Sequence, residues 1–169
     1  MEISTKKLNN AIKRFVEKDY QFAPTSLLFD YLSDKEYMYI AINQHYIIRT
    51  AVSDIQYMQE IYKLPCSGCI LENRIVNEVN RPIVDFTMGE TEKIVCAFKE
   101  IEVVNFYSST GTRISIDAKF FSTYYNKSIY KYGVPDNITF SAVDRPDTPL
   151  IMWENDEVVA LFLPIKRKD

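Results

Sequence analysis

The sequence contains few glycines and cysteines: its 169 residues include four Gly, three Cys and a single His. Four glycines beside ten Phe and twelve Tyr residues exclude a flexible, low-complexity or collagen-like chain. Three cysteines, an odd number, do not make a disulfide framework, which agrees with a reducing compartment. The first residues form no apolar signal core, and no run approaches the ~20 apolar residues of a membrane span. We therefore expect a cytoplasmic protein without a membrane partner.

Motifs for catalysis are also missing from the sequence. It contains no Gly-rich phosphate loop, no His-Glu-x-x-His and no Gly-x-Ser-x-Gly. His45 lies at a predicted hairpin turn without a nucleophile nearby, and Asp144 and Asp147 flank Arg145-Pro146 as in a turn. We expect neither an enzyme nor a cofactor.

One cysteine pair has the spacing of metal ligands. Cys66 and Cys69 form a Cys-x-x-Cys loop, but a structural zinc site needs four ligands, and Cys96 and His45 would have to complete it. A redox motif would require a helix start in a βαβ unit, which the pattern does not indicate. A turn with incidental cysteines, a zinc site and a redox pair remain the three interpretations.

Positive charge is concentrated in two predicted helices. Residues 4–18 carry Leu8, Ala11, Ile12, Phe15 and Val16 at helical spacing, and residues 118–132 follow Asp117, a typical N-cap. Together residues 4–18 and 117–132 hold eight Lys and Arg against two acids, although the chain has a net charge of −3. This distribution favours a surface for phosphates, whereas a solvated helix face is the plainer interpretation.

The remaining pattern predicts short strands within a single domain. Alternating or apolar runs predict strands at residues 26–32, 37–42, 46–52, 74–79, 83–87, 93–98 and 101–107. Residues 53–64 have helical spacing, and turns are expected at residues 80–82, 88–90 and 108–111. We divide the domain into a first half of helix plus strands (1–52), an insertion (53–110) and a second half of helix plus strands (111–169).

Residues 111–168 follow a recognisable order. A strand at 113–116 leads into the Asp117 helix, which ends at Gly133 and Pro135, and a strand at 138–143 follows. A Pro- and Asp-rich turn then precedes strands at 150–153 and 158–163, which an acidic turn joins. This order, with Pro149-Leu150-Ile151 and the closing run Leu161-Phe162-Leu163-Pro164-Ile165, resembles the C-terminal part of a bacterial-type DNA sliding clamp domain.

The resemblance implies an α+β, clamp-like fold in which two helices pack on antiparallel sheets, with a pseudo-repeat of helix plus strands. It implies a non-catalytic, sequence-independent partner of duplex DNA in replication, as a single-domain version from a phage or mobile element that could form homo-oligomers. The residues that it places toward DNA are Lys6, Lys13, Arg14, Lys119 and Lys127. The residues that it places at a partner-peptide site are Leu161, Leu163, Pro164 and Ile165. The alternative function is a protein-binding adaptor or inhibitor that acts on a replication or host protein.

Overall fold

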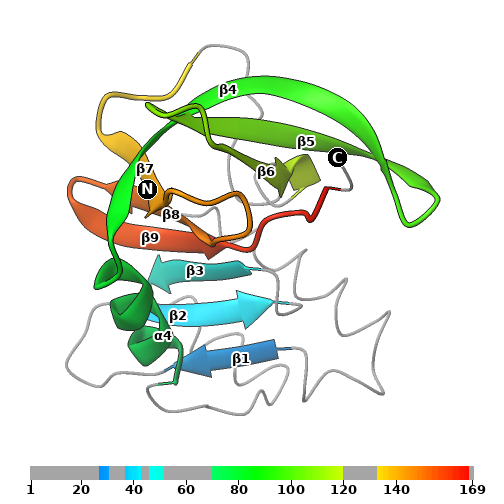
Figure 1. Cartoon of the computed structure of the whole chain (residues 1–169). Helices are drawn as coiled ribbons and strands as arrows, with labels where there is room; N and C mark the ends of the chain where they lie inside the picture. The colour runs from blue at the N-terminus through cyan, green and yellow to red at the C-terminus, as the bar shows by residue number, and fades with distance from the viewer. Residues whose placement is uncertain (1–26, 31–36, 43–45, 52–69, 120–132, 168–169) are drawn as a thin grey trace. The chain divides into compact units, whose positions relative to one another are not determined.

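The structure, a computed structural model, describes residues 27–30, 37–42, 46–51, 70–119 and 133–167 (Figure 1). The chain divides into two compact units, Met1–Asn77 and Glu78–Asp169. The described part of the first unit includes three antiparallel strands, β1 (Leu27–Asp30), β2 (Tyr37–Ile42) and β3 (Tyr46–Ala51). The sequence predicted all three strands, because apolar and β-branched side chains recur along each run.

The helix α4 spans Ile70–Val79, across the boundary between the units. Leu71 and Ile75 lie one helical turn apart and are both buried, and Glu72 in the first turn interacts favourably with the helix dipole. The predicted strand at residues 74–79 is therefore wrong. The apolar period in this segment is helical, and it becomes visible only when Ile70 and Leu71 are included.

The second unit is an antiparallel sheet of six strands in the order β9-β8-β7-β4-β5-β6. Its strands are β4 (Ile83–Cys96), β5 (Lys99–Ser108), β6 (Arg113–Asp117), β7 (Ile138–Val143), β8 (Leu150–Glu154) and β9 (Glu157–Phe162). Buried residues follow one another without alternation in β6, β8, β9 and residues 103–106 of β5, so both faces of the sheet are covered there. Phe106 and Phe140 lie in this core, with ring centroids 4.7 Å apart.

Strand β4 is long and curved, and its pairing changes along its length (Figure 1). Its first residues pair with β7, from Ile83 to Phe86, and its later residues pair with β5. The β4–β5 register shifts between Met88 and Thr91, which marks a β-bulge. A Cβ on Gly89 would lie 2.7 Å from the Tyr107 ring, so only glycine fits here without a shift. The predicted turn at residues 88–90 is thus a bulge inside one strand.

The clamp-like α+β fold with two helices on antiparallel sheets is contradicted by this structure. The described residues are mostly six-stranded antiparallel sheet, and α4 is their one complete helix. The segment 53–110, expected to be an insertion, supplies β4 and β5, two interior strands of the sheet order. The predicted pseudo-repeat did not include the β4–β7 pairing, because this pairing joins residues far apart in sequence and local patterns do not report such contacts.

The two predicted basic helices lie largely outside the described residues. Their expected core positions Leu8, Ile12, Phe15, Phe121 and Tyr124 all belong to segments that the structure does not describe. Ala118 and Lys119 are helical, and the Asp117 carboxylate accepts a hydrogen bond of 2.9 Å from the Lys119 backbone N–H. The predicted N-cap at Asp117 is therefore confirmed.

Candidate functional site

Three neighbouring strands of the second unit each contribute one polar side chain to a shared site. Asn105 in β5 is fully buried and lies opposite Ser115 in β6, whose hydroxyl donates a 2.6 Å hydrogen bond to Asn105 Oδ1. Asn105 Nδ2 donates to Glu92 Oε2 in β4 at 2.9 Å. A buried amide with its oxygen and nitrogen both engaged is fixed in orientation. We call Glu92, Asn105 and Ser115 the guanidinium site, because of what occupies it.

The Arg167 guanidinium lies in this site. It donates a two-pronged pair of hydrogen bonds to Glu92, from Nη2 to Oε1 at 2.7 Å and from Nη1 to Oε2 at 2.9 Å. Nη1 also reaches Ser115 Oγ at 3.2 Å and Asn105 Oδ1 at 3.4 Å. The Arg167 side chain is 16% exposed and that of Glu92 37%. The hydrogen bonds from Arg167, followed by that from Asn105, lower the pKa of Glu92 to about 2.

A second carboxylate extends the network on the bulged part of β4. Glu90 Oε1 accepts hydrogen bonds from Tyr107 Oη at 2.5 Å and from Asn105 Nδ2 at 3.0 Å. The Tyr107 hydroxyl is the main reason that the pKa of Glu90 is lowered, and the same bond raises the pKa of Tyr107. A general acid at neutral pH needs a raised carboxyl pKa. The pKa values of Glu90 and Glu92 are lowered instead, so both carboxylates carry a negative charge at neutral pH and are suited to holding a cation.

The chain end reaches the guanidinium site through an extended segment, residues 163–167, which we call the strap. It leaves β9, at one end of the six-strand order, and the Ile165 backbone N–H donates to Ser115 O in β6, at the other end, at 2.8 Å (Figure 1). The strap thereby brings Arg167 next to β4, β5 and β6. The Arg167–Glu92 contact joins residues 75 positions apart.

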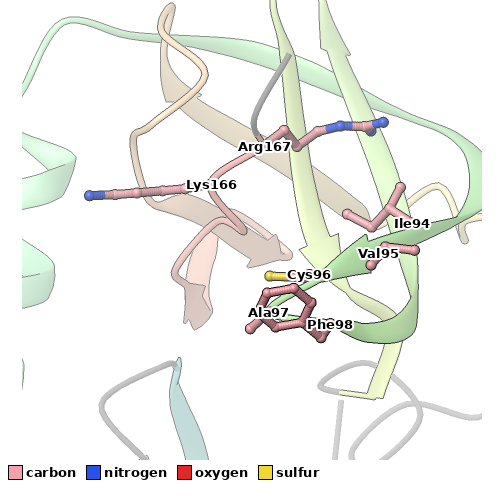
Figure 2. A pocket seen from close by; sticks show the side chains of 7 residues that line it. All are labelled: Ile94, Val95, Cys96, Ala97, Phe98, Lys166 and Arg167. Carbon is pink, nitrogen blue, oxygen red and sulfur yellow. The ribbon is translucent and has the colours of Figure 1, made fainter.

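The hairpin of β4 and β5 forms an arm, residues 91–102, that extends past the end of β6 (Figure 1). At its tip Ala97 and Phe98 both have a positive φ, 49° and 65°, as a type I′ turn requires. Phe98 is fully exposed and Val95 is 75% exposed. A hollow of about 370 Å³ lies beside the tip, lined by residues 94–98 and by Lys166 and Arg167 of the strap. Figure 2 shows the Lys166 side chain extending away from the tip.

The loop that contains Asp144 has a structural role in the sheet. Asp144 accepts hydrogen bonds from Thr110 Oγ1 at 2.7 Å and from Ser108 Oγ at 2.8 Å, and the contact with Thr110, followed by those with Thr112 and Ser108, lowers the pKa of Asp144. Asp147 forms an exposed 3.2 Å ion pair with Arg145. The prediction that these acids belong to a turn is confirmed.

Most of the predicted site residues lie outside the described part of the chain. These are Lys6, Lys13, Arg14 and Lys127 for DNA, and Cys66, Cys69 and His45 for zinc. Lys119 is exposed two residues after Asp117, and Cys96 is half-buried in β4 and lines the hollow beside the arm tip. The DNA surface and the zinc site therefore stay predictions. Among the residues that the structure describes, no three His, Cys, Asp or Glu side chains are grouped to hold a metal.

The residues predicted to bind a partner peptide belong to β9 and the strap. Leu161 is buried in β9, whereas Leu163, Pro164 and Ile165 are half-buried in the strap. Sequence reasoning missed the guanidinium site and the arm tip. The sequence did contain one indication of the tip. Ala97 and Phe98 are the only two residues between two strand-like runs, and a two-residue connection is typical of a tight hairpin.

Comparisons with known proteins identified no relative of this chain. A scan of protein-family models, a search of curated proteins and a search of solved structures each found no match. In the described residues, no helix combines the length and the apolarity that crossing a membrane requires. The case for a function therefore comes from the geometry of the second unit.

Proposed function

We propose that this chain is a non-catalytic protein-binding module whose contact surface is the tip of the β4–β5 arm. The observation that carries the proposal is Phe98, an aromatic residue that is fully exposed and held at a φ of +65°. A bulky side chain in the left-handed region is a genuine outlier, and such strain costs of order 1–3 kcal/mol. Strain of this kind clusters where a protein binds or switches, so it supports a function for the tip.

The surroundings of Phe98 are those of an interface anchor. Val95 is exposed on the same hairpin, and the adjacent hollow is lined by Ile94 and Cys96. Aromatic side chains dominate the binding energy of protein interfaces because a single ring buries a large apolar area in a partner's pocket. The arm presents such a ring at the end of a two-stranded ribbon, where a partner can reach it.

The charges on the arm favour a protein over a membrane or a nucleic acid as its partner. Lys93 and Glu100 lie across the two strands with 3.9 Å between Nζ and Oε1, and Lys93 also faces Glu102 in the register. Both members of the ion pair are largely exposed. Anionic lipids and phosphates attract surfaces on which basic residues predominate, whereas this surface carries both signs.

The test is site-specific photo-crosslinking with the full-length chain in its native cells. A photoreactive residue replaces Phe98 in one variant and Val76 in a control, because Val76 is another exposed apolar residue, on α4. We expect a discrete adduct with one protein from position 98, and its disappearance when Val95 is also changed to Thr. Equal labelling from positions 98 and 76, or no adduct from position 98, would contradict the proposal.

A further inference from the structure

The guanidinium site is assembled by the strands without help from its occupant. Asn105 is held by Ser115 on one side and by Glu90 and Glu92 on the other, and Glu90 is held in turn by Tyr107. All these residues lie in β4, β5 and β6, whereas Arg167 arrives on the strap. None of these bonds involves Arg167, so the strands by themselves can position the acceptors for a guanidinium, and preorganisation of this kind lowers the cost of binding.

Two hollows flank the strap. One hollow, of about 370 Å³, lies between the strap and the arm tip, and another of about 460 Å³ is lined by Ile165, Lys166 and Arg167 together with Arg113 and Pro146. Leu163, Pro164 and Ile165 are half-buried and Lys166 is exposed. A segment flanked by open space loses few van der Waals contacts when it leaves.

The contacts of the strap define what the site recognises. The two-pronged contact with Glu92 and the further acceptors at Ser115 and Asn105 match the planar fork of arginine, and a lysine ammonium cannot make the two parallel bonds. The Ile165 N–H bond to the Ser115 carbonyl fixes an extended backbone two residues before the arginine. The recognised sequence is thus a residue with a free backbone N–H, which excludes proline, then any residue, and then arginine.

We propose that Glu92, Asn105 and Ser115 form an arginine-binding site that accepts an extended peptide from another protein molecule in place of the chain's own strap. The strap then acts as a competing internal ligand, since a partner peptide binds when its arginine displaces Arg167. This activity is separate from the contact surface at the arm tip. It requires a partner segment with an arginine rather than a partner with an apolar pocket.

The experiment uses full-length protein with Arg167→Ala, which vacates the site, and a fluorescent peptide with the sequence of residues 163–169. Fluorescence anisotropy measures the Kd for the variant and for the wild type. We expect the variant to bind at least tenfold more tightly than the wild type, because Arg167 no longer competes. A peptide with Lys in place of its Arg should bind at least tenfold more weakly, because it keeps the charge but loses the fork.

The matched control is the double variant Arg167→Ala with Glu92→Gln, which should lose the binding. N-ethylguanidinium should compete with the peptide, whereas ethylammonium at the same concentration should not. Equal binding of the Arg and Lys peptides, or full binding by the double variant, would overturn the proposal. An Arg167→Ala protein that fails to fold would overturn it as well, because the strap would then be an obligatory part of the fold.

Discussion

The strain at the arm tip leads to a quantitative prediction about stability. Replacing Ala97 by Asn and Phe98 by Gly installs the pair that best adopts a type I′ turn. A left-handed conformation costs an ordinary residue roughly 1–2 kcal/mol, and glycine avoids this cost. Phe98 is fully exposed, so its removal sacrifices no buried area in the described fold. We expect the free energy of unfolding to rise by about 1–2 kcal/mol, somewhat offset by the greater freedom of glycine in the unfolded chain.

The fluorescence of Trp153, the single tryptophan, reports on the unfolding of the second unit, which contains the arm. It lies in β8 of the same sheet, half-buried, and its Nε1 donates a 2.6 Å hydrogen bond to Ser141 Oγ. Urea titration followed by its fluorescence gives the stability change, and the gain corresponds to ~2–4 °C in Tm per kcal/mol for a chain of this size.

The other tight hairpin of the sheet supplies the control for this experiment. Asn155 and Asp156 also have positive φ values, 50° and 65°, but Asn and Asp tolerate the left-handed region. Replacing Asp156 by Gly should therefore change the stability by less than the change at the arm tip. If the variant with both replacements at the arm tip were no more stable than the wild type, Phe98 would have to make stabilising contacts, and its proposed role as an exposed anchor would be refuted.

Three further predictions concern the sheet of the second unit. Gly89→Ala should destabilise the protein by about 1–3 kcal/mol in urea titration, because the new Cβ would meet the Tyr107 ring at 2.7 Å; a neutral result would show that the ring moves freely. Phe106→Ala should cost about 3–5 kcal/mol in the same assay, because Phe106 is fully buried, and a cost below ~1 kcal/mol would contradict its place in the core. Glu92 has a folded pKa of about 2 against an ordinary value of 4.5, so its stabilising contribution is complete above about pH 4.5 and is lost as the pH falls toward 2. Acid titrations should show that Glu92→Gln lowers stability at pH 7 and flattens the decline between pH 4.5 and 2, and an unchanged slope would argue against the contact with Arg167.

Local patterns identified many elements of this protein correctly. Alternating or apolar runs predicted β1, β2, β3, β6, β7, β8 and β9, and the Asp117 carboxylate accepts the expected capping hydrogen bond from the Lys119 N–H. These features depend on neighbours along the chain, such as the period of a strand, the hydrogen bond of an N-cap or the chemistry of a turn. The strand predicted at residues 74–79 was wrong because the predicted segment began after Ile70 and Leu71, and without these two residues its helical spacing of apolar residues is not visible.

The arrangement of those elements came from the tertiary structure alone. Strand order depends on which strand edges pair. Strand β4 pairs with β7 across more than fifty intervening residues. The pattern of polar and apolar residues along the chain does not report such a pairing, so it could not test the resemblance to a two-helix clamp. The guanidinium site has the same origin. Taken singly, the residues of the site are ordinary polar residues of three strands and of the strap, namely Glu92, Asn105, Ser115 and Arg167. They form a binding site and its ligand because the sheet places the three strands side by side and the strap crosses to them. The sequence determined the local conformations, whereas hydrogen bonds between distant residues decided the sheet and its site, because such bonds leave no periodic signal in the chain.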